Sequence, residues 1–433
     1  METKLARIAE IAKTKPEEKF TALYHHINLE MLEECHYEIA RNKAPGVDKV
    51  TKEEYEANLT ENLHKLVERL KQKSYRPQAV KRTYIPKGEG KAMRPLGIPA
   101  YEDKVVQLAL TKILQAVYEQ DFLDFSYGFR PNKSCHDALK KLNCNIEKGK
   151  ISYVVDVDIR GFFNHVNHKW VVKFIEHRIG DPNIIRLIVR FLKAGIMENG
   201  EWEPSLKGTP QGGVISPLLA NIYLHYALDL WFEKVVKKHC RGEAQIIRYA
   251  DDFVCCFQYK DEADKFYRAL QQRLAKFGLE IAEEKSKVIE FGRFAEDNCK
   301  KKGKKKPDTF DFLGFTHYCS KGRNGKFRVK RKTSRKKFRA KVKAFKAWIK
   351  SARHFDIDYI WDKVRLKLMG HYRYYGITDN SGMLYNFKFE ITKLLYKWLN
   401  RRSQRRSFNY EEFNKFLKYN PLPQPKIYVN IYG

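Results

Sequence analysis

The sequence predicts an α+β unit with a small antiparallel sheet, followed by an all-α, strongly basic C-terminal region. β-rich runs at residues 151–159 and 246–257 lie among segments in which apolar residues recur at spacings of three and four. The composition then changes near residue 297, and residues 321–350 contain fifteen Lys and Arg but no acidic residue. A chain of 433 residues is long enough for two or three structural units. We therefore place a domain boundary at residues 320–330.

Local signals predict the individual elements. Helices are predicted over residues 17–72, 101–120, 218–238 and 262–277, the first range being broken by a Pro-Gly turn at 43–48. Ser216 is expected to be the N-cap of the third helix, with Pro217 in its first turn. Extended runs at residues 84–86 and 95–99 flank a predicted hairpin tip at 87–91.

The charge of the chain indicates a polyanionic partner. It carries 84 Lys and Arg against 52 Asp and Glu, a net charge of +32, which is far more than solubility requires. Nucleic acid is the first candidate because aromatic residues are abundant, with 25 Tyr and 27 Phe, and a membrane surface is the second. Since no apolar run approaches 18 residues and the start is no signal peptide, we expect a cytoplasmic protein without membrane association.

Eight cysteines are scattered along the chain without a CxxC pair, so neither a zinc ribbon nor a disulfide framework is expected. Cys255 and Cys256 fall in an apolar run and are interpreted as core residues.

Two basic segments follow residue 297. Residues 300–306 include six lysines and are expected to form a flexible loop. Beyond them, apolar residues at 338, 342, 345 and 349 repeat with helical spacing and predict a buried helix face. Another face of this helix, here named the basic rail, is predicted to bind RNA phosphates; it consists of Lys336, Arg339, Lys343, Lys346 and Lys350.

Two groups of aspartates predict a metal site. Asp251 and Asp252 lie between apolar runs, at the expected tip of a hairpin, where two adjacent negative charges repel each other unless a cation neutralises them. In the strand before them, Asp156 and Asp158 fall on one face because side chains alternate along a strand. Three carboxylates on adjacent strands can hold two metal ions about 3.5–4 Å apart, as in-line phosphoryl transfer requires. From spacing alone the third carboxylate is either Asp156 or Asp158.

The same residues resemble a known family. Tyr249-Ala250-Asp251-Asp252 is similar to the active-site box of reverse transcriptases, and further blocks resemble the reverse transcriptase/maturase proteins of bacterial group II introns. In order along the chain these blocks are KAPGVD at 43–48, IPK at 85–87 with RPLGIP at 94–99, SYGFRP at 126–131, DIRGFF at 158–163, GTPQGG at 208–213 with SPLLAN at 216–221, KSK at 285–287, FLGF at 312–315, YYG at 374–376 and WLNRRS at 398–403. The resemblance extends from about residue 35 to the end.

This resemblance implies a right-hand polymerase. The N-terminal extension and fingers would occupy residues 1–100, the palm with the remaining fingers elements 101–320, and a helical thumb that doubles as the maturase domain 321–433. We expect no appended DNA-binding or His/Asn-type endonuclease module. Residues 312–315 would form the turn that grips the primer.

The resemblance also implies the catalytic groups. Asp158, rather than Asp156, would bind metal together with Asp251, Asp252 and the backbone carbonyl of Ile159. The cofactor would be two Mg²⁺ ions, for which Mn²⁺ could substitute. Lys285 would protonate the departing pyrophosphate.

Five further residues are expected to bind the incoming nucleotide. Lys87 and Arg94 would clamp the triphosphate, and Phe163 would act as a steric gate that rejects the 2′-hydroxyl. Gln211 and Gly212 lie in a Gly/Pro-rich loop that lets the backbone approach a ligand closely.

The implied activity is RNA-directed DNA synthesis from dNTPs on a primed RNA template, with structured intron RNA as a further partner. Two alternatives remain open at this point. A related enzyme could serve phage defence or CRISPR spacer acquisition, and an RNA-binding splicing cofactor could retain an idle polymerase site.

Overall fold

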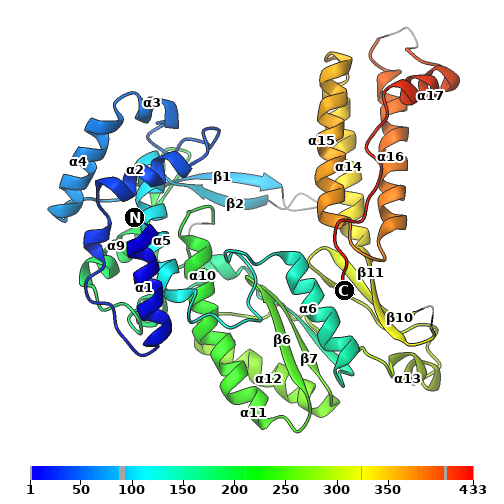
Figure 1. Cartoon of the computed structure of the whole chain (residues 1–433), viewed down its shortest axis with the longest axis horizontal. Coiled ribbons are helices and arrows are strands. Elements are labelled where there is room, and N and C mark those ends of the chain that lie inside the picture. Colours follow the sequence, from blue (N-terminus) through cyan, green and yellow to red (C-terminus); the bar gives the residue numbers. More distant parts are fainter. Residues whose placement is uncertain (1, 87–92, 210, 323, 404–406, 433) are drawn as a thin grey trace.

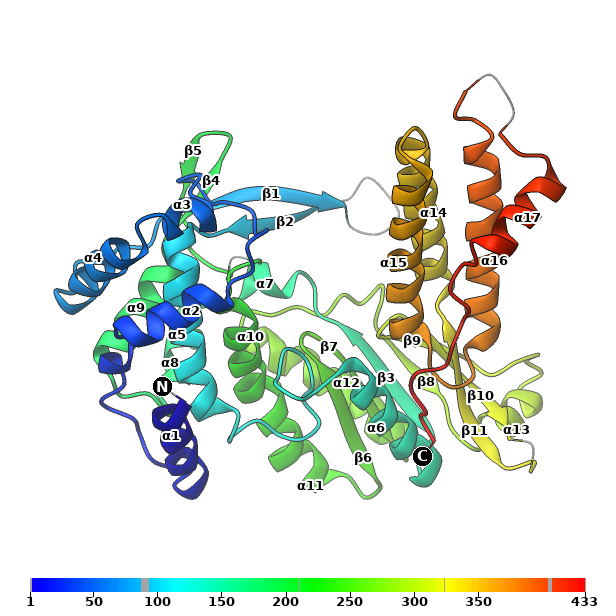
Figure 2. The ribbon, with the colours of Figure 1, turned by 45° about the horizontal axis from the view of Figure 1, so that its top comes forward.

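The computed structural model describes residues 2–86, 93–209, 211–322, 324–403 and 407–432. Figure 1 shows an N-terminal helical region, a central sheet with its helices, and a C-terminal bundle that stands beside them. In Figures 1 and 2 the hairpin of β1 and β2 reaches from the N-terminal region towards the bundle. The α+β class is confirmed.

The N-terminal region is mostly helical. Its helices are α1 (Glu2–Thr14), α2 (Leu29–Glu38), α3 (Lys52–Glu56), α4 (Leu59–Lys71) and α5 (Tyr101–Tyr118), with a 3₁₀ turn at Tyr24–His26. Thr51 caps α3 in a reciprocal capping box with Glu54. The predicted helix at 101–120 is thus confirmed as α5, which packs against α1 and α2.

A four-stranded sheet, here named the hairpin sheet, adjoins these helices. Its strands lie in the order β2 (Met93–Ile98), β1 (Val80–Pro86), β4 (Ile196–Glu198), β5 (Glu201–Glu203). β1 and β2 form the expected antiparallel hairpin, while β1 and β4 are parallel. The expected tip at 87–91 lies outside the described residues.

The central sheet carries the acidic residues. Its strands lie in the order β6 (Ala244–Tyr249), β7 (Asp252–Phe257), β3 (Tyr153–Asp158), β8 (Lys287–Glu290), and all neighbouring pairs are antiparallel. Val155 and Val157 of β3 belong to a core shared with the N-terminal helices and with α12 (Lys260–Lys276). Because side chains alternate, Asp156 and Asp158 face the other side of the sheet, together with Val154.

The helix after the glycine-rich loop differs from its prediction. Ser216 is the first residue of α10 (Ser216–Leu224), and Ile215 occupies the cap position, so the N-cap assignment was wrong. Two π-helical turns, η2 (His225–Asp229) and η3 (Phe232–Val236), interrupt the helix before α11 (Lys237–His239). Such turns occur often at functional sites.

Short helices complete the central region. They are α6 (Cys135–Lys148), α7 (Phe162–His165), α8 (His168–Ile175), α9 (Pro182–Leu192) and α13 (Ala295–Lys301). The segment expected to be a basic loop therefore begins as a helix, since α13 includes Lys300 and Lys301.

The C-terminal region is largely helical but not all-α. A three-stranded sheet of β9 (Phe310–Phe312), β10 (Phe315–Lys321) and β11 (Phe327–Thr333) precedes the helices. A boundary at residue 321 would cut the β10–β11 hairpin, whose register runs from Phe315↔Thr333 to Lys321↔Phe327. The helices are α14 (Arg335–Ala352), α15 (Ile357–Tyr375), α16 (Ser381–Leu399) and α17 (Tyr410–Tyr419).

A second core joins the central sheet to this region. It combines Val154 and Val254 of the sheet with Phe345 and Ile349 of α14 and other buried residues of the bundle. All eight cysteines are free, and Cys255 and Cys256 are buried as predicted. Among the described residues, no helix is both long and apolar enough to cross a membrane.

Candidate active site

The acidic pair lies in a tight turn between β6 and β7. Ala250 has φ +57°, a left-handed conformation that is unusual for a residue with a side chain. Gly128 lies against this turn so closely that a Cβ atom there would be 2.3 Å from the Ala250 nitrogen. The block at 126–131 therefore supports the turn by contact between backbones.

A buried ion pair holds the same turn in place. Arg248 is fully buried and donates to Asp229 in η2, with Nε 2.7 Å from Oδ1. Its Nη1 also donates to the Ala250 carbonyl oxygen at 3.1 Å and to Asn221 Oδ1 at 3.0 Å. One guanidinium thus connects the turn to both α10 and η2, and sequence reasoning did not identify it.

The acidic residues meet on one face of the central sheet. Asp158 at the end of β3 is paired in register with Asp252 at the start of β7. The Asp252 side chain opens to solvent, yet its pKa is raised to about 7, first by desolvation from the surrounding protein and then by the carboxylates of Asp156, Asp251 and Asp158. The pKa of Asp251 is likewise raised by desolvation and by Asp158.

Asp156 has the same kind of environment. Its pKa is raised to about 7, mainly by desolvation and with smaller contributions from the nearby acids Asp311 and Asp158, while the positive charge of Lys287 opposes the shift. The sheet thus concentrates negative charge that a cation would stabilise.

Lys285 lies in this acidic cluster. Its Nζ is 2.9 Å from Asp158 Oδ2, and the Asp158 amide donates to Ser286 Oγ at 3.1 Å. Ile159 and Ile281 form an antiparallel bridge whose hydrogen bonds are made by the flanking residues. In it the Ala282 amide donates to the Asp158 carbonyl oxygen, and the Arg160 amide donates to the Glu280 carbonyl oxygen. The Ile159 carbonyl is therefore not used by that bridge.

The donor set fits a hard divalent cation. Asp158, Asp251 and Asp252 offer carboxylate oxygens, which Mg²⁺ prefers, and their mutual repulsion favours binding of positive charge. Within the described part of the chain, no three His, Cys, Asp or Glu side chains are gathered closely enough to enclose a metal ion as they stand. In this arrangement the ammonium group of Lys285 supplies the compensating charge at Asp158.

Phe163 and Gln211 line one cavity of about 440 Å³. Arg82 and Tyr84 of β1 form another wall. Gly212 has φ +119°, and a Cβ atom there would be 2.7 Å from the Gly97 carbonyl oxygen, so a glycine is needed where this loop meets β2. The Gln211 carbonyl accepts from Gly97 N at 2.7 Å. The structure therefore brings these predicted residues together.

Arg94 of β2 is exposed, and its positive charge lowers the pKa of Asp251. The hairpin sheet thus places a cation within electrostatic range of the acidic turn. Lys87, the other predicted triphosphate clamp, lies outside the described residues.

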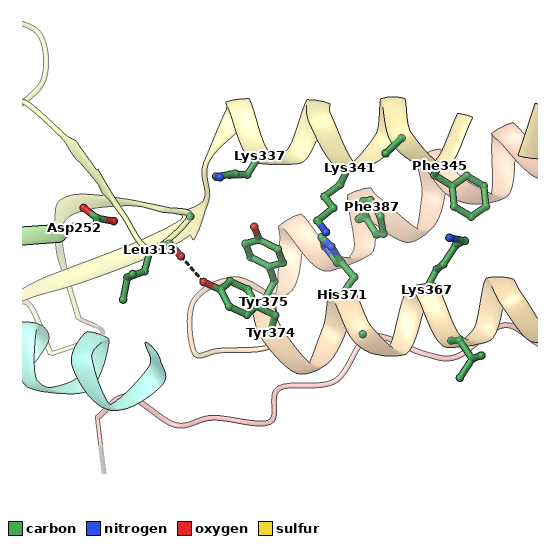
Figure 3. A pocket seen from close by; sticks show the side chains of 14 residues that line it. Asp252, Leu313, Lys337, Lys341, Phe345, Lys367, His371, Tyr374, Tyr375 and Phe387 are labelled. Carbon is green, nitrogen blue, oxygen red and sulfur yellow. Dashed lines mark hydrogen bonds between the residues drawn. The ribbon is translucent and has the colours of Figure 1, made fainter. Parts of the chain in front are cut away.

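A second cavity, here named the bundle groove, measures about 840 Å³ and runs from the acidic cluster into the C-terminal bundle. Asp252, Leu313 and Gly314 lie at one end, and α14 and α15 form its walls (Figure 3). Its cations are Lys337, Lys341 and Lys367.

The basic rail does not line this groove. Its members Lys336, Arg339, Lys343 and Lys346 are exposed, but they occupy a different face of α14 from the groove lysines. Sequence reasoning missed Lys337 and Lys341, although their four-residue spacing marks a shared helix face.

Comparisons with known proteins identify the family of this chain. The sequence profile of the family described as "Reverse transcriptase (RNA-dependent DNA polymerase)" matches residues 85–317, more than half of the chain. The chain therefore belongs to the reverse transcriptase family.

Several relatives are proteins of introns. The group II intron-encoded protein LtrA of Lactococcus lactis subsp. cremoris is 39% identical over 222 residues, which cover 51% of this chain and 37% of LtrA. Protein YkfC of Escherichia coli (strain K12) is 35% identical over 240 residues, covering 48% of this chain and 62% of YkfC. Nuclear intron maturase 2, mitochondrial, of Arabidopsis thaliana is 27% identical over 179 residues, covering 33% of this chain and 24% of that protein. The chain spans less than two thirds of the length of these relatives.

Proposed function

We propose that the protein is an RNA-directed DNA polymerase of the group II intron type. It would extend a primer with deoxynucleotides on an RNA template, the central sheet acting as palm, the hairpin sheet as fingers and the C-terminal bundle as thumb. The observation that carries this proposal is the pairing of Asp158 with Asp252 on one sheet face, next to Asp251 and at the end of the bundle groove.

The carboxylates of Asp158, Asp251 and Asp252, with the Ile159 carbonyl, would hold two Mg²⁺ ions, for which Mn²⁺ could substitute. When bound, these ions would activate the primer 3′-hydroxyl and offset the charge of the triphosphate and pyrophosphate.

The protein's own groups would bind and orient the nucleotide. Arg94 would contact the triphosphate, the Gln211 amide would hydrogen-bond the nucleotide, and the Phe163 ring would occupy the space beneath the sugar. Since Phe163 and Gln211 line one cavity, a single bound nucleotide could meet both. The Lys285 ammonium would donate a proton to the pyrophosphate oxygen.

The bundle groove would hold the duplex of template and primer. Its three lysines follow one another along α14 and α15, with Lys337 nearest to Asp252 in the view, as contacts to a phosphate backbone leaving the active site require (Figure 3). Structured intron RNA is a second proposed partner, which the names of the relatives and the exposed rail support.

The test is extension of a DNA primer annealed to RNA, with dNTPs, in Mg²⁺ and in EDTA. We expect extension only in Mg²⁺, and none by a D251N variant that binds the duplex normally. Extension by D251N at more than a few per cent of the wild-type rate would contradict the proposed site.

A splicing cofactor with an idle polymerase site is the second candidate. It is favoured by the relative named as an intron maturase and by a rail that lies away from the bundle groove. A protein that promotes splicing of a group II intron RNA but fails the extension assay would support this alternative.

A further inference from the structure

The acidic cluster and the C-terminal bundle meet at one strained turn. Leu313 and Gly314 connect β9 to β10 with φ +49° and +81°. A left-handed conformation is unfavourable for a residue with a side chain, so the surrounding contacts must hold Leu313 in place.

Leu313 contacts two regions of the molecule. It lines the same end of the bundle groove as Asp252, and a backbone hydrogen bond from Leu313 lowers the pKa of the Asp252 carboxyl against the larger effect of desolvation. The Leu313 carbonyl oxygen accepts from Tyr374 Oη at 3.0 Å (Figure 3). One peptide unit on each side of Leu313 therefore links an acidic residue of the central sheet to α15.

Tyr374 is itself held firmly at the base of the bundle. His136 Nε2 donates to its carbonyl oxygen at 2.8 Å, which ties α15 to α6. Its ring stacks near Phe315, with centroids 6.0 Å apart and planes 13° apart. Burial raises the pKa of Tyr374, so its hydroxyl stays protonated and remains a donor.

We infer that Tyr374 is a positioning residue for the proposed polymerase site. Its hydroxyl holds the Leu313–Gly314 turn, and the turn orients the Asp252 carboxylate. The packing of the bundle against the central sheet thereby determines the orientation of a proposed metal-binding group. This inference rests on the proposed function for its effect on nucleotide addition, but its effect on Asp252 does not depend on that function.

The adjacent Tyr375 provides a matched control. It is also largely buried, and its hydroxyl lies 3.1 Å from where a Cβ atom of Gly314 would be, so it packs on the same turn. It is Tyr374 whose hydroxyl bonds the Leu313 carbonyl. Y374F and Y375F each remove one oxygen atom from neighbouring tyrosines at this turn.

The experiment compares Y374F, Y375F and wild type in two measurements. The first is Mn²⁺ affinity of the protein without nucleic acid, titrated by electron paramagnetic resonance. The second is the rate of single-nucleotide addition to a primed RNA at saturating dNTP. Both are made at a temperature at which circular dichroism shows all three proteins folded.

We expect Y374F to bind Mn²⁺ more weakly and to add nucleotide about 10- to 100-fold more slowly, the range seen when a partner of a metal ligand is removed. The dNTP half-saturation of Y374F should stay within about threefold of wild type, since the turn does not touch the cavity of Phe163. Y375F should match wild type in both measurements.

Equal losses in Y375F would overturn the inference, because packing rather than the hydroxyl would then matter. Unchanged Mn²⁺ affinity and rate in Y374F would overturn it as well. If wild-type protein extends no primer, the proposed function fails, and the Mn²⁺ titration still decides whether Tyr374 positions Asp252.

Discussion

The central sheet and the C-terminal bundle place their charged residues in different ways. In the sheet, strand alternation and the register of β3 with β7 put Asp158 opposite Asp252, and the buried Arg248–Asp229 pair holds the intervening turn. In the bundle, lysines extend from exposed helix faces, and only the packing of α14 against its neighbours decides which of them line the groove. Local sequence thus defines the proposed chemistry, whereas tertiary packing defines the proposed binding surface.

The largest expected effect lies in the sheet and separates two acids on the same face. D252N should lower the rate of primer extension by about 10³-fold or more, because it removes a group proposed to bind metal. D156N is the matched control, since Asp156 shares the face and the raised pKa but is not a proposed ligand. Both rates are measured at saturating dNTP and Mg²⁺. Equal losses of rate in D252N and D156N would show that both carboxylates contribute alike, and that the pairing of Asp252 with Asp158 gives Asp252 no special role in binding metal.

The second expected effect concerns the support of the turn. D229A leaves the Arg248 guanidinium buried without its partner and should lower the free energy of unfolding by about 3–5 kcal/mol, measured by denaturant titration. E61A removes an exposed ion pair with Lys65 and should leave the unfolding midpoint unchanged. A D229A protein as stable as E61A would mean that the buried pair does not hold the turn.

How far the sequence predicts this molecule also differs between the two regions. Short local patterns predict the residues of the proposed site. Strand alternation and adjacent acids indicate the aspartates, and short sequence blocks indicate Phe163 and Gln211. Arg248 and Asp229 are nineteen residues apart and meet only through a π-helical turn, which helical periodicity does not reveal. Hydrogen bonds such as that of Tyr374 to Leu313 join residues 61 positions apart.

The bundle was predicted as a basic helical region, but not the orientation of its faces. Periodicity separates apolar from basic positions in α14, yet it cannot tell which basic face turns towards Asp252. The strand β11 was missed because its residues belong to the acid-free basic run at 321–350, which was interpreted as one helical region, although Phe327 and Val329 alternate with basic residues as in a strand.

The third prediction compares the two basic faces directly. Replacing the groove lysines Lys337, Lys341 and Lys367 by Gln should weaken binding of a primer-template duplex about 10²–10³-fold at low salt and reduce the salt slope by about 2 to 3. Replacing the rail residues Lys336, Arg339, Lys343 and Lys346 should leave the duplex affinity nearly unchanged and weaken binding of a structured intron RNA. Affinities are titrated from 50 to 200 mM salt. If the rail set controls the duplex slope, the assignment of the two faces is reversed.

The smallest expected effect concerns selection of the sugar. F163V should reduce discrimination against ribonucleotides by about 10- to 200-fold, because the space beneath the sugar opens. The ratio of kcat/KM for a dNTP and the matching rNTP measures it. F162V cannot serve as a control, since Phe162 is fully buried in the core. Wild-type discrimination in F163V would contradict the steric gate and identify Phe163 as a core residue.

Template-directed DNA synthesis is tested most directly by changing one template base. A primer is annealed to two RNAs that differ only in the first unpaired nucleotide, A or C, and each is offered one dNTP at a time in Mg²⁺. The account predicts addition of dT opposite A and of dG opposite C by wild-type protein, and no addition by D252N. Addition of the same nucleotide on both RNAs, or no addition on either, would contradict it.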